Sequence, residues 1–257
     1  MKVVVINDLH SNYQALRKIE IILDKLVFDK LVFLGDLLTY GVAVQPTLDL
    51  LTLINKRYDC VFVKGNHDQI YFDLQGGREY QYKPFPDYIN ESVLYTAEKL
   101  NLLLEQQFDW CESYEYGNVY FAHANALEYK NWSYLNSKDD FNINLIALKE
   151  RGFRGGIFGH THRAKYLAFN NESNENNVLP LPNSLSISDN STFLITNGSL
   201  GQPRGSKPSF LICDFSDKYN YKFKSVDFEY DVGLHCSEIA ESNLSFSTKE
   251  QLISFYK

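Results

Sequence analysis

Long apolar runs are missing from this chain of 257 residues, and no stretch approaches the roughly 18 consecutive apolar residues of a membrane-spanning helix. The first apolar run, Met1 to Ile6, stops at Asn7-Asp8 within one strand length, and no small-residue cleavage site follows it. We therefore expect neither a membrane partner nor a secretory signal peptide, and we predict a cytoplasmic protein. The four cysteines are widely spaced and form no Cys-x-x-Cys pair, so we expect buried or idle thiols in a reducing compartment.

Concentrated positive charge is also missing. The 32 acidic residues outnumber the 25 basic ones, which gives a net charge of −7, and no cluster of Lys and Arg stands out. This composition argues against stable nucleic-acid binding through phosphate contacts. What the chain does have is apolar surface, with 18 Phe and 18 Tyr. So much apolar surface excludes disorder over most of the chain and allows a sizeable core.

Strand-like and helix-like segments alternate in the first half of the chain. Short apolar runs at 2–6, 31–34 and 60–63 predict strands, and helical periodicity separates them at about 15–26 and 46–56. This order predicts a parallel sheet with right-handed crossovers. In the second half, alternating segments predict antiparallel strands at 164–169, 192–196, 209–213 and 221–226. We predict one α/β domain over 1–257, with surface excursions near 71–88 and 170–191.

Five of the six histidines come directly after a predicted strand, in the company of Asp, Asn or Gly. The blocks are Asp8-x-His10, Gly35-Asp36, Gly65-Asn66-His67-Asp68, Ala122-His123 and Gly159-His160-Thr161-His162. Ligands of open α/β sheets bind at the carboxyl ends of the strands, so these blocks predict one shared site. Residues two apart on an extended segment point to the same side. Asp8 with His10, and His160 with His162, are therefore expected to present paired ligands.

The side chains in these blocks suit divalent metal ions. Carboxylates, imidazoles and an amide oxygen, with no thiolate, favour Mn²⁺, Fe, Co²⁺, Ni²⁺ or Zn²⁺ over a structural cysteine–zinc site. Seven candidate ligands are too many for one tetrahedral ion. They fit two ions that share a bridging carboxylate, roughly 3.5–4 Å apart.

The order of the five blocks resembles the calcineurin-like metallophosphoesterase superfamily. The later segment Asn-Gly-Ser-Leu-Gly-Gln-Pro-Arg, residues 197–204, is similar to the Gly-Ser-Val-Gly-Gln-Pro-Arg segment of its prokaryotic phosphodiesterase-type members. The resemblance implies an α/β fold that is a four-layer α-β-β-α sandwich, with two mixed sheets face to face and helices outside. It also implies a cofactor of two divalent metal ions, with manganese favoured over iron, nickel, cobalt or zinc.

The resemblance assigns roles to residues of this chain. Asp8, His10 and His162 would hold the first ion, and Asp36 would bridge to the second. Asn66, His123 and His160 would complete the second site. His67 would be the catalytic residue, outside the metal ligands and facing the phosphate and its leaving group. Asp68 would orient His67 or a neighbouring backbone group.

The resemblance implies a metal-dependent phosphoesterase that uses a hydroxide activated by two metals on a small or nucleotide-like phosphate ester. Protein phosphatases and diadenosine tetraphosphatases of the superfamily carry Gly-Asp-x-Val-Asp-Arg-Gly, whereas the block here is Gly-Asp-Leu-Leu-Thr-Tyr-Gly. Thr39 replaces the Asp that pairs with the catalytic His, and Tyr40 replaces the phosphate-binding Arg. A monoester profits more from an arginine clamp than a diester does, so we expect a diester preference. The alternatives are a phosphomonoesterase or protein phosphatase of the same fold, and a non-catalytic binding scaffold.

Three polar residues are candidates for substrate binding. Asn12 either caps the first helix or donates a hydrogen bond to substrate. Arg163 and Arg204 either reach a phosphate or lie on solvated loops. The aromatic group of the 71–88 segment either lines the cleft and stacks a base or packs a surface excursion; its members are Tyr71, Phe72, Tyr80, Tyr82, Phe85 and Tyr88. His235 matches no block and is expected to be structural or exposed.

Overall fold

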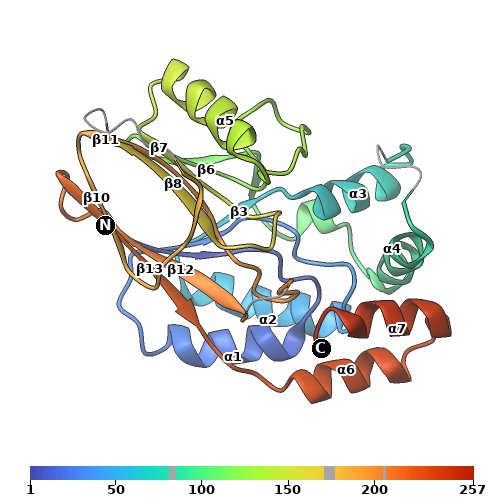
Figure 1. Ribbon diagram of the computed structural model, residues 1–257. Helices are drawn as coiled ribbons and strands as arrows, with labels where there is room; N and C mark the ends of the chain where they lie inside the picture. The colour runs from blue at the N-terminus through green and yellow to red at the C-terminus, as the bar shows by residue number, and fades with distance from the viewer. Residues whose placement is uncertain (81–84, 171–176, 205–206) are drawn as a thin grey trace.

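The computed structural model describes residues 1–80, 85–170, 177–204 and 207–257. Two β-sheets pack face to face, and helices cover both outer surfaces (Figure 1). Helices α1 (Tyr13–Leu23) and α2 (Val44–Arg57) lie on one side, and α5 (Lys138–Glu150) lies on the other. This is the four-layer α-β-β-α sandwich that was predicted.

The first sheet has seven strands in the order β10-β13-β12-β1-β2-β3-β4. Strands β1 (Lys2–Ile6), β2 (Lys30–Phe33), β3 (Cys60–Val63) and β4 (Trp110–Cys111) run parallel to one another. Strands β12 (Ser209–Asp214), β13 (Asn220–Asp227) and β10 (Leu185–Ser188) extend the sheet in antiparallel pairs. The C-terminal half of the chain therefore pairs directly with the first strand.

The second sheet has six strands in the order β5-β6-β7-β11-β8-β9. Strands β6 (Val119–Ala122), β7 (Gly155–Phe158) and β11 (Ser191–Thr196) are parallel. Strands β5 (Tyr114–Tyr116), β8 (Lys165–Asn170) and β9 (Leu179–Pro180) pair antiparallel at the two sides. Both sheets are mixed, as the predicted fold requires.

Alternation along the buried strand β1 divides the core into layers. Val3 and Val5 pack between the two sheets, whereas Val4 and Ile6 pack toward α1 and α2. A third apolar cluster lies between the second sheet and α5. Because both faces of β1 are buried, its sequence is a continuous apolar run. Its first polar residues, Asn7 and Asp8, come where the chain leaves the sheet.

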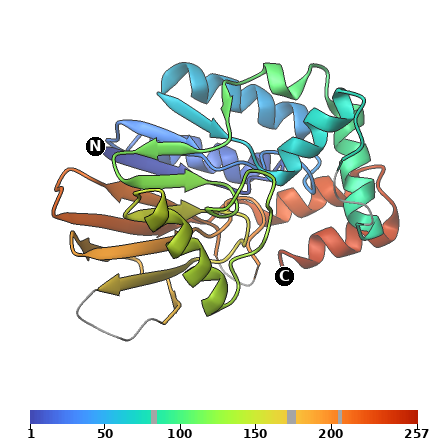
Figure 2. The same cartoon turned by 90° about the horizontal axis from the view of Figure 1, so that it is seen from above.

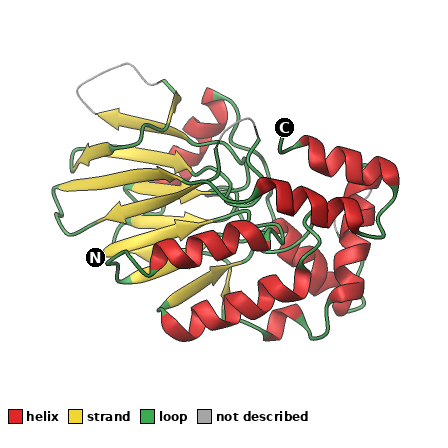
Figure 3. Cartoon of the chain, turned by 90° about the horizontal axis from the view of Figure 1, so that it is seen from below, coloured by secondary structure: helices red, strands yellow, loops and turns green. Residues whose placement is uncertain are grey.

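The remaining helices gather at one end of the sandwich, as two views at right angles to Figure 1 show (Figures 2 and 3). They are α3 (Asn66–Gln75), α4 (Asp87–Lys99), the short 3₁₀ helix η1 (Leu104–Gln106), α6 (Val232–Glu241) and α7 (Phe246–Ser254). Helix α7 packs against α4 and α6. No helix of the described residues combines the length and apolar character needed to cross a bilayer.

The two predicted surface excursions differ from what the structure shows. Residues 71–75 belong to α3, and Tyr71 and Phe72 are buried in the core beneath it. The 170–191 segment contains two short strands, β9 and β10, and β10 pairs with β13 of the opposite sheet. Residues 81–84, including Tyr82, and residues 171–176 lie outside the described residues. Polar composition concealed these strands because both lie at sheet edges, where outward-facing residues stay solvated.

Candidate metal centre

The predicted blocks meet at one edge of the two sheets. Asp8, Asp36 and Asn66 follow β1, β2 and β3 of the first sheet. His123 and His160 follow β6 and β7 of the second sheet. Since the carboxyl ends of these parallel strands point the same way, polar groups far apart in sequence converge there. Each of these side chains is almost completely buried.

The backbone at this edge is bent rather than extended. Asp8, His10, Asp36, His160 and His162 all have positive φ angles, between 52° and 63°. This left-handed conformation is uncommon for residues with a side chain and is concentrated at functional sites. The expected extended backbone is therefore wrong, but the expected pairing of Asp8 with His10 is confirmed, because both belong to one candidate metal group. The expected pairing of His160 with His162 is wrong, because they belong to different groups.

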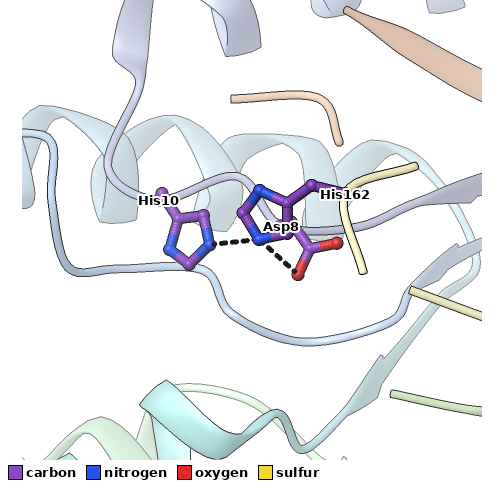
Figure 4. A group of neighbouring side chains, drawn as sticks. All are labelled: Asp8, His10 and His162. Atoms are coloured by element: carbon purple, nitrogen blue, oxygen red, sulfur yellow. Dashed lines mark hydrogen bonds and ion pairs between the residues drawn. The ribbon is translucent and has the colours of Figure 1, made fainter. Parts of the chain in front are cut away.

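The first candidate metal group contains Asp8, His10 and His162. One potential ligand atom from each lies within 4.8 Å of the other two. The Nε2 atoms of His10 and His162 are 3.2 Å apart, and His162 Nε2 is 3.6 Å from Asp8 Oδ1 (Figure 4). Gly201 sits directly behind Asp8, and a Cβ there would be 1.7 Å from the carbonyl oxygen of Leu9. Only glycine allows this close approach.

The second candidate metal group contains Asp36, His123 and His160, again within 4.8 Å of one another. His123 Nε2 is 3.2 Å from His160 Nδ1 and 2.9 Å from Asn66 Oδ1. The amide oxygen of Asn66 therefore faces the same point as the two imidazoles. Four potential ligands meet here.

Asp36 lies between the two groups. Its Oδ2 atom is 3.4 Å from His123 Nε2 in the second group and 3.9 Å from His10 Nε2 in the first. Its Oδ1 atom accepts a hydrogen bond from the backbone N–H of His67 at 2.8 Å. A carboxylate in this position can contact ions on both sides.

The hydrogen bonds behind the histidines fit metal ligation. In each of the four histidines, one ring nitrogen is within hydrogen-bond distance of a backbone carbonyl oxygen. These oxygens belong to Leu38, Leu34, Trp132 and Gln202, and the distances are 2.5–3.1 Å. Such a carbonyl keeps the proton on that nitrogen, so the other nitrogen presents a lone pair toward the centre. Asp8 Oδ1 is buried with no hydrogen-bond partner among the described residues. These features fit two divalent cations.

Burial and mutual charge determine the protonation of the metal-free groups. Burial opposes ionisation of Asp36, but the surrounding histidines, His123 foremost, hold its pKa well below the usual value. Burial lowers the pKa of His123, but the charge of Asp36, the hydrogen bond to it and the charge of Asp8 together raise that pKa to about 9. Burial raises the pKa of Asp8 to about 6. Burial and the positive charge of His123 lower the pKa of His160 to about 3. Asp36 and His123 are thus an ion pair at neutral pH.

His67 lies beside both groups but belongs to neither. Its ring is 5.2 Å from that of His10 and 4.9 Å from that of Tyr40, measured between centroids. Its Nδ1 atom is buried without a hydrogen-bond partner among the described residues. Burial lowers the pKa of His67, although the charge of Asp36 opposes this. A buried nitrogen with no partner remains available for a bound molecule.

Asp68 holds the backbone around Asp36. Its carboxylate accepts hydrogen bonds from the N–H groups of Asp36, Leu37 and Gly65, at 2.7–3.1 Å. Of the two expected roles of Asp68, the contacts show the one that orients the backbone. These bonds join the turn after β2 to the first turn of α3.

The three predicted substrate-binding residues have different surroundings. Asn12 caps α1, where its oxygen accepts from the N–H of Ala15 and its Nδ2 donates to Gly201 O and Tyr230 Oη. The helix-cap alternative is therefore confirmed, and the amide of Asn12 is engaged within the protein. Arg163 is exposed, directly after His162. Arg204 is half-buried and donates to Gln202 Oε1 at 3.2 Å.

The aromatic residues around the centre only partly match the predicted group. Tyr71 and Phe72 are core residues, so they cannot stack a base. Tyr88 stacks on Tyr40, with 6.4 Å between ring centroids, and Tyr40 in turn contacts the rings of His10 and His67. The sequence analysis missed Tyr134, which stacks on the His160 ring at 4.2 Å. No local pattern marks this residue, because the loop that carries it has neither a motif nor periodicity.

Comparisons with known proteins agree with this geometry. Residues 1–181 match the profile of the calcineurin-like phosphoesterases. The uncharacterized protein MJ0912 of Methanocaldococcus jannaschii is 28% identical over 250 residues, which cover 94% of this chain and 93% of that protein. A metallophosphoesterase from Sphaerobacter thermophilus has a similar fold, with a TM-score of 0.73 and 21% identity, over 99% of this chain and 100% of that one. The hypothetical protein PH1004 from Pyrococcus horikoshii also has a similar fold, with a TM-score of 0.72 and 16% identity. The comparison covers 98% of this chain and 97% of that one.

The chain belongs to the calcineurin-like phosphoesterase family. Members of this family are hydrolases of phosphoric ester bonds that depend on two metal ions. The predicted family is therefore confirmed.

Proposed function

We propose that this protein hydrolyses a small or nucleotide-like phosphate ester and prefers diesters to monoesters. The observation that supports it is the position of Asp36, whose carboxylate lies between two groups of buried ligands. Asp8, His10 and His162 would hold one cation, and Asn66, His123 and His160 the other. Asp36 would contact both, because a carboxylate has two oxygens and a negative charge.

Two cations held there would neutralise the phosphate oxygens and make a water molecule acidic enough to attack near neutral pH. With cations bound, the four histidines would present unprotonated nitrogens inward, because their other nitrogens can donate to backbone carbonyls. Manganese as the native metal and a cytosolic location remain predictions.

His67 is proposed as the general acid for the leaving group. Its ring lies next to the rings of His10 and Tyr40, and its buried Nδ1 has no hydrogen-bond partner among the described residues. The lowered pKa means that this ring is neutral at pH 7 in the free protein. A bound phosphate anion would raise the pKa of His67 again, so the ring would gain its proton together with the substrate.

The diester preference depends on Tyr40. This side chain occupies the position of the arginine in the protein phosphatases of the superfamily, and only 5% of its surface is exposed. Burial raises the pKa of Tyr40 well above 10, so it brings a neutral hydroxyl instead of a positive charge. A doubly charged monoester therefore lacks one positively charged contact at this position.

One observation favours monoester hydrolysis as a second candidate. Arg204 donates to Gln202 Oε1 at 3.2 Å, and the carbonyl oxygen of Gln202 lies 2.7 Å from His162 Nδ1. Burial lowers the pKa of His162 and raises that of Tyr40, and the charge of Arg204 lowers both. Arg204 is therefore close enough to act on a phosphate bound at the first group. It comes from the loop after β11 and could replace the missing arginine.

The experiment compares kcat/KM for bis-p-nitrophenyl phosphate and p-nitrophenyl phosphate at the same Mn²⁺ concentration. We expect a diester preference, and no hydrolysis after the metal is removed with a chelator. A monoester preference of about tenfold or more would contradict the diester assignment. Arg204→Ala would then show whether that residue supplies the clamp. Failure to hydrolyse either ester would favour the scaffold alternative.

A further inference from the structure

A basic pocket lies beside the first metal group. It has a volume of about 540 Å³, and strands β8, β9, β12 and β13 contribute to its walls. Its lining includes four cationic side chains, those of Arg163, Lys165, Arg204 and Lys207. Asp227 is the one carboxylate among the described lining residues. Such a concentration of positive charge is unusual in a chain with a net charge of −7.

Two arginines of the pocket lie near the first metal group in the chain. Arg163 directly follows His162 in the chain. Arg204 comes two residues after Gln202, whose carbonyl oxygen lies 2.7 Å from His162 Nδ1. Arg204 Nε is buried without a hydrogen-bond partner among the described residues. The pocket and the first group are therefore connected through Arg163, next to His162, and through Arg204, which donates to the Gln202 side chain.

The positive charge is only partly neutralised within the protein. Lys207 lies 4.0 Å from the carboxylate of Glu229, and Lys165 donates to the carbonyl of Asn136 at 3.3 Å. The described carboxylates form no ion pair with Arg163 or Arg204. Asn136, Asn183 and Ser209 add neutral polar groups to the lining. Cations with neutral donors between them suit a phosphate, which accepts several hydrogen bonds at once.

The cavity on the other side of the centre has the opposite character. It has a volume of about 680 Å³ and reaches His123. Glu112, Glu128 and Glu150 line it, with Lys130 and Arg151 as the only cations among its described residues. An anionic group of a substrate would therefore be drawn to the basic pocket and away from this one.

We propose that the basic pocket binds a second phosphate group of the substrate, separate from the phosphate that is hydrolysed. The substrate class is then a phosphodiester with an additional phosphate, such as a nucleoside that carries the scissile diester at one end and a phosphate at the other. This inference rests on the proposed function, because it assumes that the scissile phosphate binds at the metal groups. Arg163 and Arg204 would contact either phosphate, or the part of the substrate that joins the phosphate at the metal groups to the phosphate in the basic pocket.

Calorimetry on the Mn²⁺-loaded protein tests the pocket without reference to turnover. The probes are thymidine 3′,5′-bisphosphate and thymidine 5′-monophosphate, which differ by one phosphate. We expect the bisphosphate to bind at least about tenfold more tightly, because the pocket supplies charge-assisted contacts. In the double variant Lys165→Gln/Lys207→Gln, this advantage should fall below about threefold.

The matched control is Lys222→Gln/Lys224→Gln. Both lysines are exposed on β13, and alternation along the strand turns them away from Ser225 and Asp227, which line the pocket. This control removes the same charge and should keep the full advantage of the bisphosphate. Equal binding of the two probes to the unaltered protein, or equal losses in both double variants, would overturn the proposal.

A kinetic experiment separates this inference from the proposed function. The p-nitrophenyl ester of thymidine 5′-monophosphate is compared with the same ester carrying a 3′-phosphate. We expect the 3′-phosphate to raise kcat/KM by about tenfold, and Lys165→Gln/Lys207→Gln to abolish that gain while leaving the simpler ester unaffected. If neither ester is hydrolysed, the proposed function fails, and the calorimetry still decides whether the pocket binds phosphate.

Discussion

The two candidate metal groups are supported by different parts of the chain. The residues that hydrogen-bond to the ligands of the second group all come from the first two thirds of the chain. They are Leu34, which bonds to His123, Trp132, which bonds to His160, and Asp68, which bonds to Asp36. The first group depends on the loop after β11. Gln202 O lies behind His162, and the backbone oxygen of Asp8 accepts from Ser199 Oγ and Gly201 N.

The C-terminal helices extend this support of the first group. Tyr256 donates to Gly201 O at 2.9 Å, and Asn12 donates to the same oxygen at 2.8 Å. His235, which is fully buried, places Nε2 at 2.9 Å from the Tyr256 hydroxyl. His235 is thus structural, as one of the two expectations had it. The match to the family profile ends at residue 181, so the first group relies on a segment beyond that match.

The largest effect is expected from a change that removes the link between the groups. Asp36→Asn keeps the shape of the side chain but replaces the charged carboxylate by a neutral amide, which holds two cations poorly. We expect the affinity for both ions to fall by at least about 100-fold, and turnover with it. Elemental analysis and kcat measure this, with Asp73→Asn as a control outside the centre. Full metal occupancy of both sites in Asp36→Asn, together with normal turnover, would refute the bridging role.

His67→Ala should act on the reaction and not on either metal group. We expect kcat to fall by about 10²–10⁴-fold for an alkyl ester, while metal content stays unchanged. The loss should be smaller for p-nitrophenyl esters, because their leaving group hardly needs a proton. An equal loss for good and poor leaving groups would point to electrostatic stabilisation instead of proton donation.

Tyr256→Phe should distinguish the two groups. The change removes a buried hydroxyl that donates to Gly201 O, and we expect it to cost about 1 kcal/mol in the free energy of unfolding. Metal affinity should weaken at the first group and stay nearly constant at the second. A two-site metal titration and chemical denaturation measure both effects, with the exposed Tyr219→Phe as the control. Equal weakening at both groups would contradict the proposed division of support.

The smallest effect is expected where α7 is attached to α4. Glu91 accepts hydrogen bonds from the backbone N–H and hydroxyl of Ser245 and from the hydroxyl of Thr248. Partial burial opposes the shift, but these bonds lower the pKa of Glu91 below its usual 4.5. The stabilisation is therefore present above about pH 4.5 and is lost as the pH falls through the lowered pKa.

Melting temperatures of the unaltered protein and Glu91→Gln, measured between pH 3 and pH 7, test this attachment. We expect the variant to be less stable at pH 7 and the difference to shrink toward pH 3. Glu98→Gln, exposed on the same helix, should show no such dependence. A difference that does not change with pH would show that the charge of Glu91 is unimportant.

Local pattern was sufficient for the features that depend on neighbouring residues. The apolar run of β1 and the polar residues after it predicted a buried strand that ends at a site. The same reasoning placed the blocks at Asp36, Asn66 and His123 after strands. Asn12 was a recognisable helix cap because its side chain bonds to a residue three positions away. The approach failed at Tyr71 and Phe72, where the glycines and prolines that follow concealed the helix.

Polar residues directly after buried strands are a local signal, so the amino-acid order predicts which residues can bind metal and that they meet at strand ends. How these residues divide into two groups depends on the packing of the whole chain. His160 and His162 are two residues apart, yet they join different groups, whereas Asp8 and His10, with the same spacing and also with positive φ angles, join one group. The position of Arg204 and the support from Tyr256 likewise depend on packing between distant segments. No local pattern encodes such contacts, because they form only when the sheets and the C-terminal helices come together.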